Sequence, residues 1–349
     1  MGEEDGVGAG SLLGGRGGYI FGMKVLVTGG AGYIGSVMTR LLLEEGHEVT
    51  VYDNLKQGHR AAVSPGARLV VGDIGDGAAL EPLFAEGAFE AVLHFAGLIR
   101  VPESVEDPAR YFDNNVARGV TLLNACCRYG VRRFVFSSTA AVYGEPKEVP
   151  VTEDAPTIPS NPYGDTKRVF EELLVAYGRA CGLRSARLRY FNVCGAYRGL
   201  GEDHRPETHL VPLLLKSALD PDYEFTVCGD DYPTRDGTCV RDYVHIHDLC
   251  RAHLLALAAL EHGASFVYNL GSGRGFTVKE VLAAAEDVLG RKLKHRVAGR
   301  RAGDAAALVA GSAKIERELG WRREKDDIRK MIADAWEFHR AHPQGYKEE

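Results

Sequence analysis

The sequence predicts an α/β protein, with a doubly wound parallel sheet followed by a smaller mixed α/β region. Three observations lead to this fold class. From residue 23 onward, short apolar runs alternate with longer stretches of helical periodicity. The first apolar run ends in a glycine-rich turn, and after about residue 192 the rhythm becomes irregular, with loops containing proline and glycine near 195–206 and 230–237. Alternating strands and helices favour a parallel sheet joined by right-handed crossovers.

Five strands are expected before about residue 192, because apolar residues gather there in short runs between helical stretches. They span residues 24–28, 48–52, 91–94, 133–137 and 185–188. A helix at 248–261 and a strand at 266–270 are expected further along. We therefore divide the chain into a first domain at 23–192 and a smaller second domain at 193–346, in which residues of about 240–270 return to the first sheet.

The first 22 residues differ from the rest, since nine of them are glycine. Such a segment buries too little apolar surface to offset its ordering entropy, so residues 1–22 are expected to be a disordered leader. Across all 349 residues, 48 acidic side chains outnumber 42 basic ones. This balance does not favour nucleic acid as a partner. The longest apolar stretch, near residues 254–260, is much shorter than the roughly 20 residues that cross a bilayer, so no membrane association is expected.

Cysteine usage and the start of the chain both bear on the compartment. Glu3, Glu4 and Asp5 stand where a secretory signal would be basic. The seven cysteines show no CxxC pair and no cysteine/histidine ligand spacing, which favours a reduced cytoplasm over a disulfide framework. Cys126 and Cys127 are expected on a helix as small buried residues, and no metal site is expected.

The residues after the first strand read Gly29-Gly30-Ala31-Gly32-Tyr33-Ile34-Gly35 and lead into a helix. Glycines at these positions allow a tight turn and let the backbone approach a pyrophosphate, which the helix N-terminus then attracts. Asp53 ends the next strand, 18 residues after Gly35. Its carboxylate can accept hydrogen bonds from both ribose hydroxyls and repels a 2′-phosphate. The first domain is therefore predicted to be a Rossmann domain that binds NAD rather than NADP.

Other cofactor contacts are expected at the carboxyl ends of the following strands. Asp73 is placed to meet the adenine edge, although it equally fits a surface-loop carboxylate. Phe95, Ala96 and Gly97 follow the strand at 91–94, where small residues let a cofactor pass close to the backbone. The full set of predicted cofactor-binding residues is Gly29, Gly32, Tyr33, Ile34, Gly35, Asp53, Asn54, Asp73, Ile74, Phe95, Ala96, Gly97, Asn114, Tyr163 and Lys167.

A cap at Asn161 followed by Pro162 predicts a helix that runs to about residue 181. On it, Tyr163 and Lys167 are four residues apart and share a face. A tyrosine base working at neutral pH needs its pKa lowered by roughly 3 units, or about 4 kcal/mol. A lysine ammonium ~6 Å away supplies about 2.8 kcal/mol at an effective dielectric constant of ~20, and the positive nicotinamide ring could supply the rest.

Ser137, Ser138 and Thr139 stand at the carboxyl end of the strand expected at 133–137, the edge where doubly wound sheets bind ligands. The hydroxyl of Thr139 can share a proton with a substrate hydroxyl. Thr139, Tyr163 and Lys167 are therefore the predicted catalytic residues of a dehydrogenase-type site.

These features resemble the extended short-chain dehydrogenase/reductases and, more specifically, the UDP-glucose 4-epimerases. Matching motifs cover nearly all of residues 23–346, and the later ones are the more specific. Besides the glycine turn they are His94-Phe95-Ala96-Gly97, Asp113-Asn114-Asn115, Ser137-Ser138-Thr139-Ala140-Ala141-Val142-Tyr143-Gly144, Tyr163-Gly164-Asp165-Thr166-Lys167, Arg189-Tyr190-Phe191-Asn192, Tyr232-Pro233-Thr234, Asp236-Gly237-Thr238, Val240-Arg241-Asp242-Tyr243 and Arg300-Arg301-Ala302-Gly303-Asp304.

The resemblance implies reversible epimerisation at carbon 4 of UDP-glucose and UDP-galactose through a transient 4-keto sugar, with tightly bound NAD and no net redox change. Tyr163 would act as the base. The resemblance also implies a homodimer formed through helices at about 107–129 and 162–181. The substrate-binding residues that it implies are Thr139, Tyr163, Asn192, His209, Leu210, Arg241, Arg301 and Asp304; arginine suits phosphate because its guanidinium binds two oxygens at once.

Several positions depart from the family pattern. His209 stands where many relatives have asparagine, and Ile99, beside Arg100, replaces a lysine of some members. Leu308 lies where residue size decides whether an N-acetylated sugar fits. A UDP-N-acetylglucosamine or UDP-pentose 4-epimerase therefore remains an alternative.

Two more distant alternatives are a nucleotide-sugar 4,6-dehydratase or decarboxylase and a non-catalytic NAD-binding protein. The first is disfavoured because Ala140 and Ala141 stand where dehydratases carry an acidic residue. The second is disfavoured because Thr139, Tyr163 and Lys167 are all present.

Overall fold

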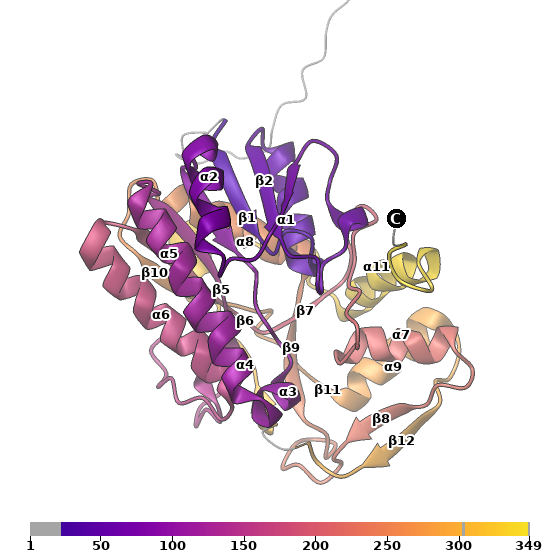
Figure 1. Cartoon of the computed structure of the whole chain (residues 1–349). Coiled ribbons are helices and arrows are strands. Elements are labelled where there is room, and N and C mark those ends of the chain that lie inside the picture. The colour runs from indigo at the N-terminus through magenta and orange to yellow at the C-terminus, as the bar shows by residue number, and fades with distance from the viewer. Residues whose placement is uncertain (1–21, 302–303, 348–349) are drawn as a thin grey trace, which may run out of the picture.

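The computed structural model describes residues 22–301 and 304–347. Its centre is a seven-stranded sheet in which every neighbouring pair is parallel (Figure 1). The order is β10-β6-β5-β4-β1-β2-β3, with bounds β1 (Lys24–Thr28), β2 (Glu48–Asp53), β3 (Arg68–Val71), β4 (Ala91–His94), β5 (Arg133–Thr139), β6 (Arg184–Tyr190) and β10 (Phe266–Leu270). The predicted doubly wound fold class is confirmed.

Strand β3 was not among the expected strands. It is a short edge strand whose two end residues, Arg68 and Val71, are exposed. A strand with so little buried surface carries only a weak apolar pattern. The expected leader, apart from its last residue, lies outside the described residues.

Helices cover both faces of the large sheet, because successive side chains of a strand point to opposite faces. Val25 and Val27 of β1 pack with α1 (Tyr33–Glu44) and α8 (Ile246–Ala259). Leu26 packs on the other face, where the helices are α2 (Gly77–Gly87), α5 (Arg118–Arg128) and α6 (Pro162–Cys181). Shorter helical segments are η1 (Arg60–Ala62), α3 (Val101–Glu106), α4 (Pro108–Phe112), η2 (Asp113–Ala117) and η3 (Ala140–Tyr143).

A smaller region with two further sheets lies beside the carboxyl ends of the large one (Figure 1). Its core is formed by buried residues of the helices and strands of this region. Those elements are β7 (Asn192–Cys194), α7 (Leu210–Leu219), β8 (Phe225–Cys228), β9 (Val240–His245), β11 (Gly275–Thr277), α9 (Val278–Leu289), β12 (His295–Ala298), β13 (Ala307–Leu308) and α11 (Ile328–Ala341), while α10 (Ala313–Leu319) contacts β10 and α8.

The chain crosses between the two regions more than once. Strand β9 pairs with β7, β11 and β13 in the second sheet. The next two elements, α8 and β10, lie on and in the large sheet. The two regions are thus interleaved in sequence.

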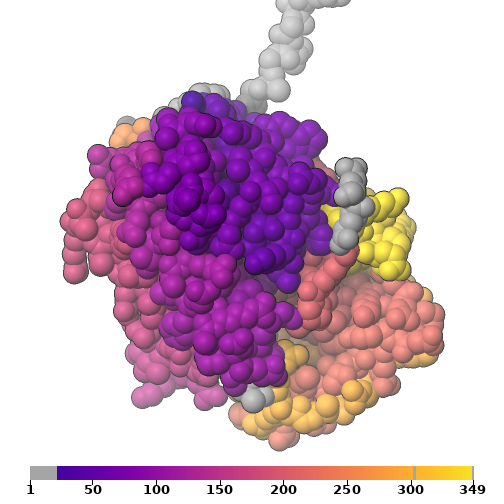
Figure 2. All heavy atoms as spheres, in the orientation of Figure 1, coloured from indigo at the N-terminus to yellow at the C-terminus, as the bar shows by residue number. Residues whose placement is uncertain are grey.

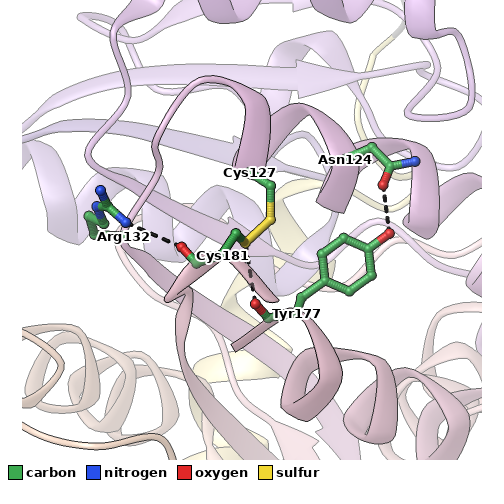
Figure 3. The surroundings of a disulfide bond; sticks show 5 residues. All are labelled: Asn124, Cys127, Arg132, Tyr177 and Cys181. Carbon is green, nitrogen blue, oxygen red and sulfur yellow. Dashed lines mark hydrogen bonds between the residues drawn. A yellow bond between two sulfur atoms is a disulfide. The ribbon is translucent and has the colours of Figure 1, made fainter. Parts of the chain in front are cut away.

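Cys127 of α5 and Cys181 at the end of α6 form a disulfide, shown in Figure 3. The expectation that the cysteines would be unpaired is wrong for these two, while Cys126 is free and fully buried as expected. The partners are 54 residues apart, so local spacing carries no signal of their pairing. It depends on the packing of the two helices.

Within the ranges that the structure describes, no helix is both long enough and apolar enough to cross a membrane.

Candidate active site

A cavity of about 620 Å³ lies between the carboxyl ends of the large sheet and the second region, and Figure 2 shows the surface hollowed between these two parts. Its walls include every residue that the sequence analysis placed in cofactor binding, catalysis or substrate binding. Residues far apart in sequence thus meet in one place, from Gly29 at the end of β1 to Asp304 beside β13.

The glycine turn has no room for larger residues. Gly29 has a φ of 73°, and a Cβ on it would lie 2.5 Å from the backbone nitrogen of Ala96. A Cβ on Gly35 would lie 2.2 Å from the carbonyl oxygen of Gly29. The turn therefore keeps strand, helix and neighbouring loop in close contact, and the N–H groups at the start of α1 face an open cradle. This cradle fits a pyrophosphate.

Asp53 lies at the end of β2 with its carboxylate buried at the cavity wall. It accepts hydrogen bonds from the backbone N–H groups of Ala31 (3.0 Å) and Leu55 (2.8 Å). Burial raises the pKa of Asp53, although both hydrogen bonds act in the opposite direction. The two bonds orient the carboxylate toward the position of a ribose.

Asp73 is part of a polar cluster rather than a free carboxylate. Its side chain accepts hydrogen bonds from Asn54 (3.1 Å), Arg118 (2.8 Å) and the N–H of Gly75 (3.0 Å). Burial alone would raise the pKa of Asp73, but these hydrogen bonds and the guanidinium together lower it. Arg118 also lines the cavity and was missed from the sequence, because 45 residues separate it from Asp73.

Lys167 is buried behind Tyr163 on α6. Its Nζ donates a hydrogen bond to the carbonyl oxygen of Ser137 (2.8 Å) and lies 4.9 Å from the ring centre of Phe136. The ring centre of Tyr163 is 5.9 Å from the same Nζ. Burial lowers the pKa of Lys167 to about 8, against the attraction of Glu171.

The expected lowering of the pKa of Tyr163 is not found in the chain alone. Burial raises this pKa to about 12, and a hydrogen bond from Thr139 offsets only part of the effect. Lys167 directs its ammonium to Ser137 and not to the phenol. In the chain alone the phenol of Tyr163 is thus neutral near pH 7. Additional positive charge beside the phenol would lower its pKa and favour its action as a base.

A buried network that the sequence analysis missed holds the catalytic helix on the sheet. The carboxylate of Glu171, one turn after Lys167, pairs with Arg189 of β6 through two hydrogen bonds of 2.9 and 2.6 Å. Ser138 donates to the same carboxylate, and Arg189 also donates to the hydroxyl of Tyr143 (2.8 Å). Glu171 could have been identified from the sequence, because it follows Lys167 by four residues and Tyr163 by eight and therefore shares their helix face.

The second region contributes arginines to the opposite wall. Nη1 of Arg241 donates to the carbonyl oxygens of Ala305 (2.8 Å) and Val240 (2.9 Å), which fixes its direction. Nη2 lies 3.4 Å from a carboxylate oxygen of Asp304. Arg301 approaches Cys228, with 4.0 Å between Nη2 and Sγ.

The remaining residues that were predicted to bind substrate also line the cavity. Asn192 hydrogen-bonds the hydroxyl of Tyr243, and His209 precedes α7, whose first residue is Leu210. His209 contacts Glu202, a cavity residue that the sequence analysis did not identify. The positions that depart from the family pattern or distinguish the alternatives, namely Ile99, Arg100, Ala140, Ala141 and Leu308, also line the cavity.

Comparisons with known proteins agree with this geometry. The model of the NAD-dependent epimerase/dehydratase family matches residues 25–271. A curated UDP-glucose 4-epimerase of Corynebacterium glutamicum is 51% identical over 316 residues, which cover 90% of this chain and 95% of the relative.

Solved structures are similar over the same length. UDP-glucose 4-epimerase from Brucella ovis in complex with NAD is 44% identical with a TM-score of 0.87, covering 91% of this chain and 98% of that one. The enzyme from Bifidobacterium longum in complex with NAD⁺ and UDP is 39% identical with a TM-score of 0.87, covering 92% and 99%. This chain therefore belongs to the NAD-dependent epimerase/dehydratase family.

Proposed function

We propose that the chain is a UDP-glucose 4-epimerase, which interconverts UDP-glucose and UDP-galactose through a transient 4-keto sugar and uses tightly bound NAD. The observation that carries this proposal is one continuous cavity. The glycine turn and Asp53 form one end, Thr139 and Tyr163 lie in the middle, and Arg241 is at the other end. The names of the curated relatives support the same activity.

The cofactor end fits NAD, because the glycine turn leaves space that any Cβ would fill and Asp53 is anchored beside it. When bound, NAD supplies a hydride acceptor and a positive ring. Tyr163 removes the proton of the sugar 4-hydroxyl and later returns one, while Thr139 holds the phenol and the hydroxyl in line. Lys167 adds positive charge, since its Nζ lies 5.9 Å from the centre of the phenol ring.

The keto sugar has to rotate in the cavity between the two hydride transfers, so that its other face meets the cofactor. The nucleotide, in contrast, has to stay bound. We propose that Asn192, Arg241 and Arg301 bind the diphosphate and uridine, and that Asp304 binds the uridine ribose. The support is the placement of Arg241, whose Nη1 is held by two carbonyl groups while its side chain lines the cavity. Anchoring at this end leaves the hexose itself free to rotate.

Isotope retention tests the proposed route. UDP-glucose carrying deuterium on carbon 4 is incubated with purified chain and no added NAD. We expect UDP-galactose that retains the deuterium on carbon 4, because the hydride leaves and returns within one closed site. Loss of the label to water would contradict the proposal.

A second candidate activity concerns the sugar rather than the reaction. Leu308 lines the cavity, and leucine is intermediate between the small and bulky residues that set whether an N-acetylated sugar fits. We propose that hexoses are preferred and that UDP-N-acetylglucosamine is a slower substrate, with UDP-xylose as the pentose to compare. A rate panel over the three UDP-sugars checks this order, and complete inactivity on the acetylated sugar would remove it from the proposal.

Two competing functions are elimination by a nucleotide-sugar 4,6-dehydratase and NAD binding without catalysis. Ala140 and Ala141 line the cavity and offer no acid or base for chemistry at carbons 5 and 6. A 4,6-dehydratase would release a 4-keto-6-deoxy product that mass spectrometry detects. A non-catalytic NAD protein would bind the cofactor without interconverting the two UDP-hexoses.

We also propose a homodimer formed through the helices around α4, α5 and α6. The support is Phe112, which ends α4 with 39% of its surface exposed beside the η2 turn that leads into α5. Analytical ultracentrifugation of the natural chain should give the mass of two chains. Phe112→Glu should shift the equilibrium toward monomer, whereas Ile158→Glu, also at an exposed apolar residue, should leave it unchanged.

A cytoplasmic location remains our proposal. It is supported by five unpaired cysteines among the seven. The bond between Cys127 and Cys181 does not fit a reducing compartment, where this pair would be two thiols. Alkylation of thiols in intact cells, followed by mass spectrometry, should find both residues modified. A disulfide in those cells would argue for an oxidising compartment.

A further inference from the structure

Two histidines and two glutamates converge in the loop between β7 and α7. Glu202, His204, Glu207 and His209 each offer one possible ligand atom, and these four atoms all lie within 4.8 Å of one another. We call these four residues the His/Glu cluster. Its members come from eight consecutive residues, so the loop alone builds it.

The spacing of the donor atoms suits a small cation. A tetrahedral ion with bonds of about 2.0–2.1 Å holds its donor atoms about 3.3 Å apart. His204 Nδ1 lies 3.1 Å from Glu202 Oε1 and 3.8 Å from Glu207 Oε2. His209 Nδ1 lies 3.8 Å from Glu207 Oε1 and also contacts Glu202 Oε1. The 3.1 Å separation is close to the tetrahedral value, and the two separations of 3.8 Å exceed it by about 0.5 Å. The contact between His209 and Glu202 would have to lengthen.

The burial of two carboxylates favours the binding of a cation by the cluster. The side chain of Glu202 is 5% exposed and that of Glu207 is 15% exposed. Two carboxylates this close repel each other when water is excluded, unless positive charge lies between them. Imidazole nitrogens together with carboxylate oxygens are donors that Zn²⁺ accepts readily. We propose that the His/Glu cluster binds one divalent transition-metal ion, and that Zn²⁺ suits it best.

Hydrogen bonds other than those between cluster members hold the loop in shape. The backbone N–H of Tyr346 donates to Asp203 Oδ2 (2.9 Å), and Nε2 of His59 is 2.9 Å from the carbonyl oxygen of Asp203. Glu207 Oε1 accepts the backbone N–H of Thr208 (2.6 Å). The donors are thus oriented before an ion arrives, which reduces the entropy lost on binding.

The ion would be accessible from the cavity, since Glu202, His204 and His209 line it and the side chain of His209 is 47% exposed. On binding, Zn²⁺ takes the place of the direct contacts that His204 and His209 otherwise make with Glu202. The ion ties together both ends of the segment that leads into α7. This property goes beyond the proposed epimerase activity and is measured without it.

Titration with zinc tests the proposal. Full-length chain without an affinity tag is dialysed against a chelator and then titrated with ZnCl₂ in a calorimeter. We expect one Zn²⁺ per chain with a micromolar or tighter Kd. The Co²⁺-loaded chain should show the visible bands of a tetrahedral site without a thiolate charge-transfer band, because the cluster contains no cysteine.

Variants locate the ion. His204→Ala and Glu207→Gln should each weaken Zn²⁺ binding by more than about 100-fold, because each removes a ligand. His262→Ala changes a histidine whose side chain is 88% exposed outside the cluster and should bind as the natural chain does. Thermal unfolding verifies that each variant is folded, and if His204→Ala does not fold, the nearly isosteric Glu207→Gln decides. No zinc binding by the natural chain, or unchanged affinity in the folded variants, would overturn the proposal.

Discussion

Tyr163 is the residue on which the proposed chemistry depends, and its surroundings hold it as a neutral phenol. Burial raises its pKa to about 12, while Thr139 provides the one hydrogen bond that opposes this. A shift of one pKa unit corresponds to about 1.4 kcal/mol. Ionisation near neutral pH therefore requires several kcal/mol from charges that arrive with the cofactor. The chain without cofactor should contain no tyrosinate at this position.

Tyr163→Phe should lower the epimerisation rate by about 10² to 10⁴-fold, the usual effect of removing a general base. The phenyl ring still fills the half-buried position of the tyrosine ring, so NAD should stay bound. Steady-state rates and the cofactor absorbance of the purified variant measure the two effects. Tyr177→Phe removes a hydroxyl from the same helix at its bond to Asn124, and it should keep the natural rate. A Tyr163→Phe variant of natural activity would exclude this residue as the base.

Lys167→Ala should move the rising limb of the pH–rate profile to higher pH. The ammonium favours the phenolate, so its removal raises the pKa of Tyr163 and a more basic solution is needed to ionise it. The profile of kcat against pH, recorded with NAD-saturated enzyme, measures the shift. Lys330→Ala, at an exposed lysine of α11, serves as the control. An unshifted profile with full NAD content would contradict an electrostatic role of Lys167.

At the scale of elements, the contact between α6 and β6 decides where the catalytic side chains lie. Glu171 on α6 and Arg189 on β6 are both buried, and two hydrogen bonds join them. Lys167 is one helical turn from Glu171, so its position depends on this contact. The ion pair thus acts as a clamp between the helix that carries Tyr163 and the sheet that carries Thr139.

Glu171→Gln should lower the free energy of unfolding by about 3 kcal/mol, because Arg189 is then a buried charge without its partner. Urea denaturation measures the change. Glu172→Gln is the matched control on the next residue, where an exposed glutamate pairs with Arg168 one turn away. Such a pair contributes only about 0.5 kcal/mol. Equal effects of the two substitutions would show that the buried pair has no special role.

At the scale of the whole molecule, buried neutral histidines make the fold sensitive to acid. Burial and the nearby Lys167 lower the pKa of His94 to about 3, and burial lowers that of His253 to about 4. Both groups have a pKa near 6.5 when unfolded. Between these values the unfolded chain binds more protons than the folded chain, so stability is full above pH 6.5 and is lost as the pH falls.

Each of the two histidines should contribute a slope of up to about 1.4 kcal/mol per pH unit between pH 6.5 and about 4. Unfolding free energies measured across this range give the slope. His253→Gln should reduce it, because glutamine does not titrate. His262→Gln, at an exposed site, should leave the slope as it is. A stability that does not depend on pH in this window would contradict the burial of uncharged imidazoles.

Parts of the cavity that lie within one local motif could be predicted from the sequence, whereas contacts between separate elements could not. The glycine turn and Asp53 were predictable because a strand, a turn and a helix that follow one another specify them locally. Tyr163 and Lys167 were predictable for the same reason, since four residues along one helix determine a shared face. Arg118 beside Asp73 was not predictable, because those two residues meet only when separate elements pack.

The sequence by itself determined the fold class, the glycine turn and the order of the catalytic side chains along α6, because each of these follows from local periodicity and backbone geometry. Only the tertiary structure decided that Cys127 reaches Cys181 and that Arg189 pairs with Glu171. It also decided that Tyr163 lies half-buried at the cavity wall, where desolvation raises its pKa to about 12. Burial and long-range contacts arise from how the elements pack together, and a linear pattern of residues does not record that packing.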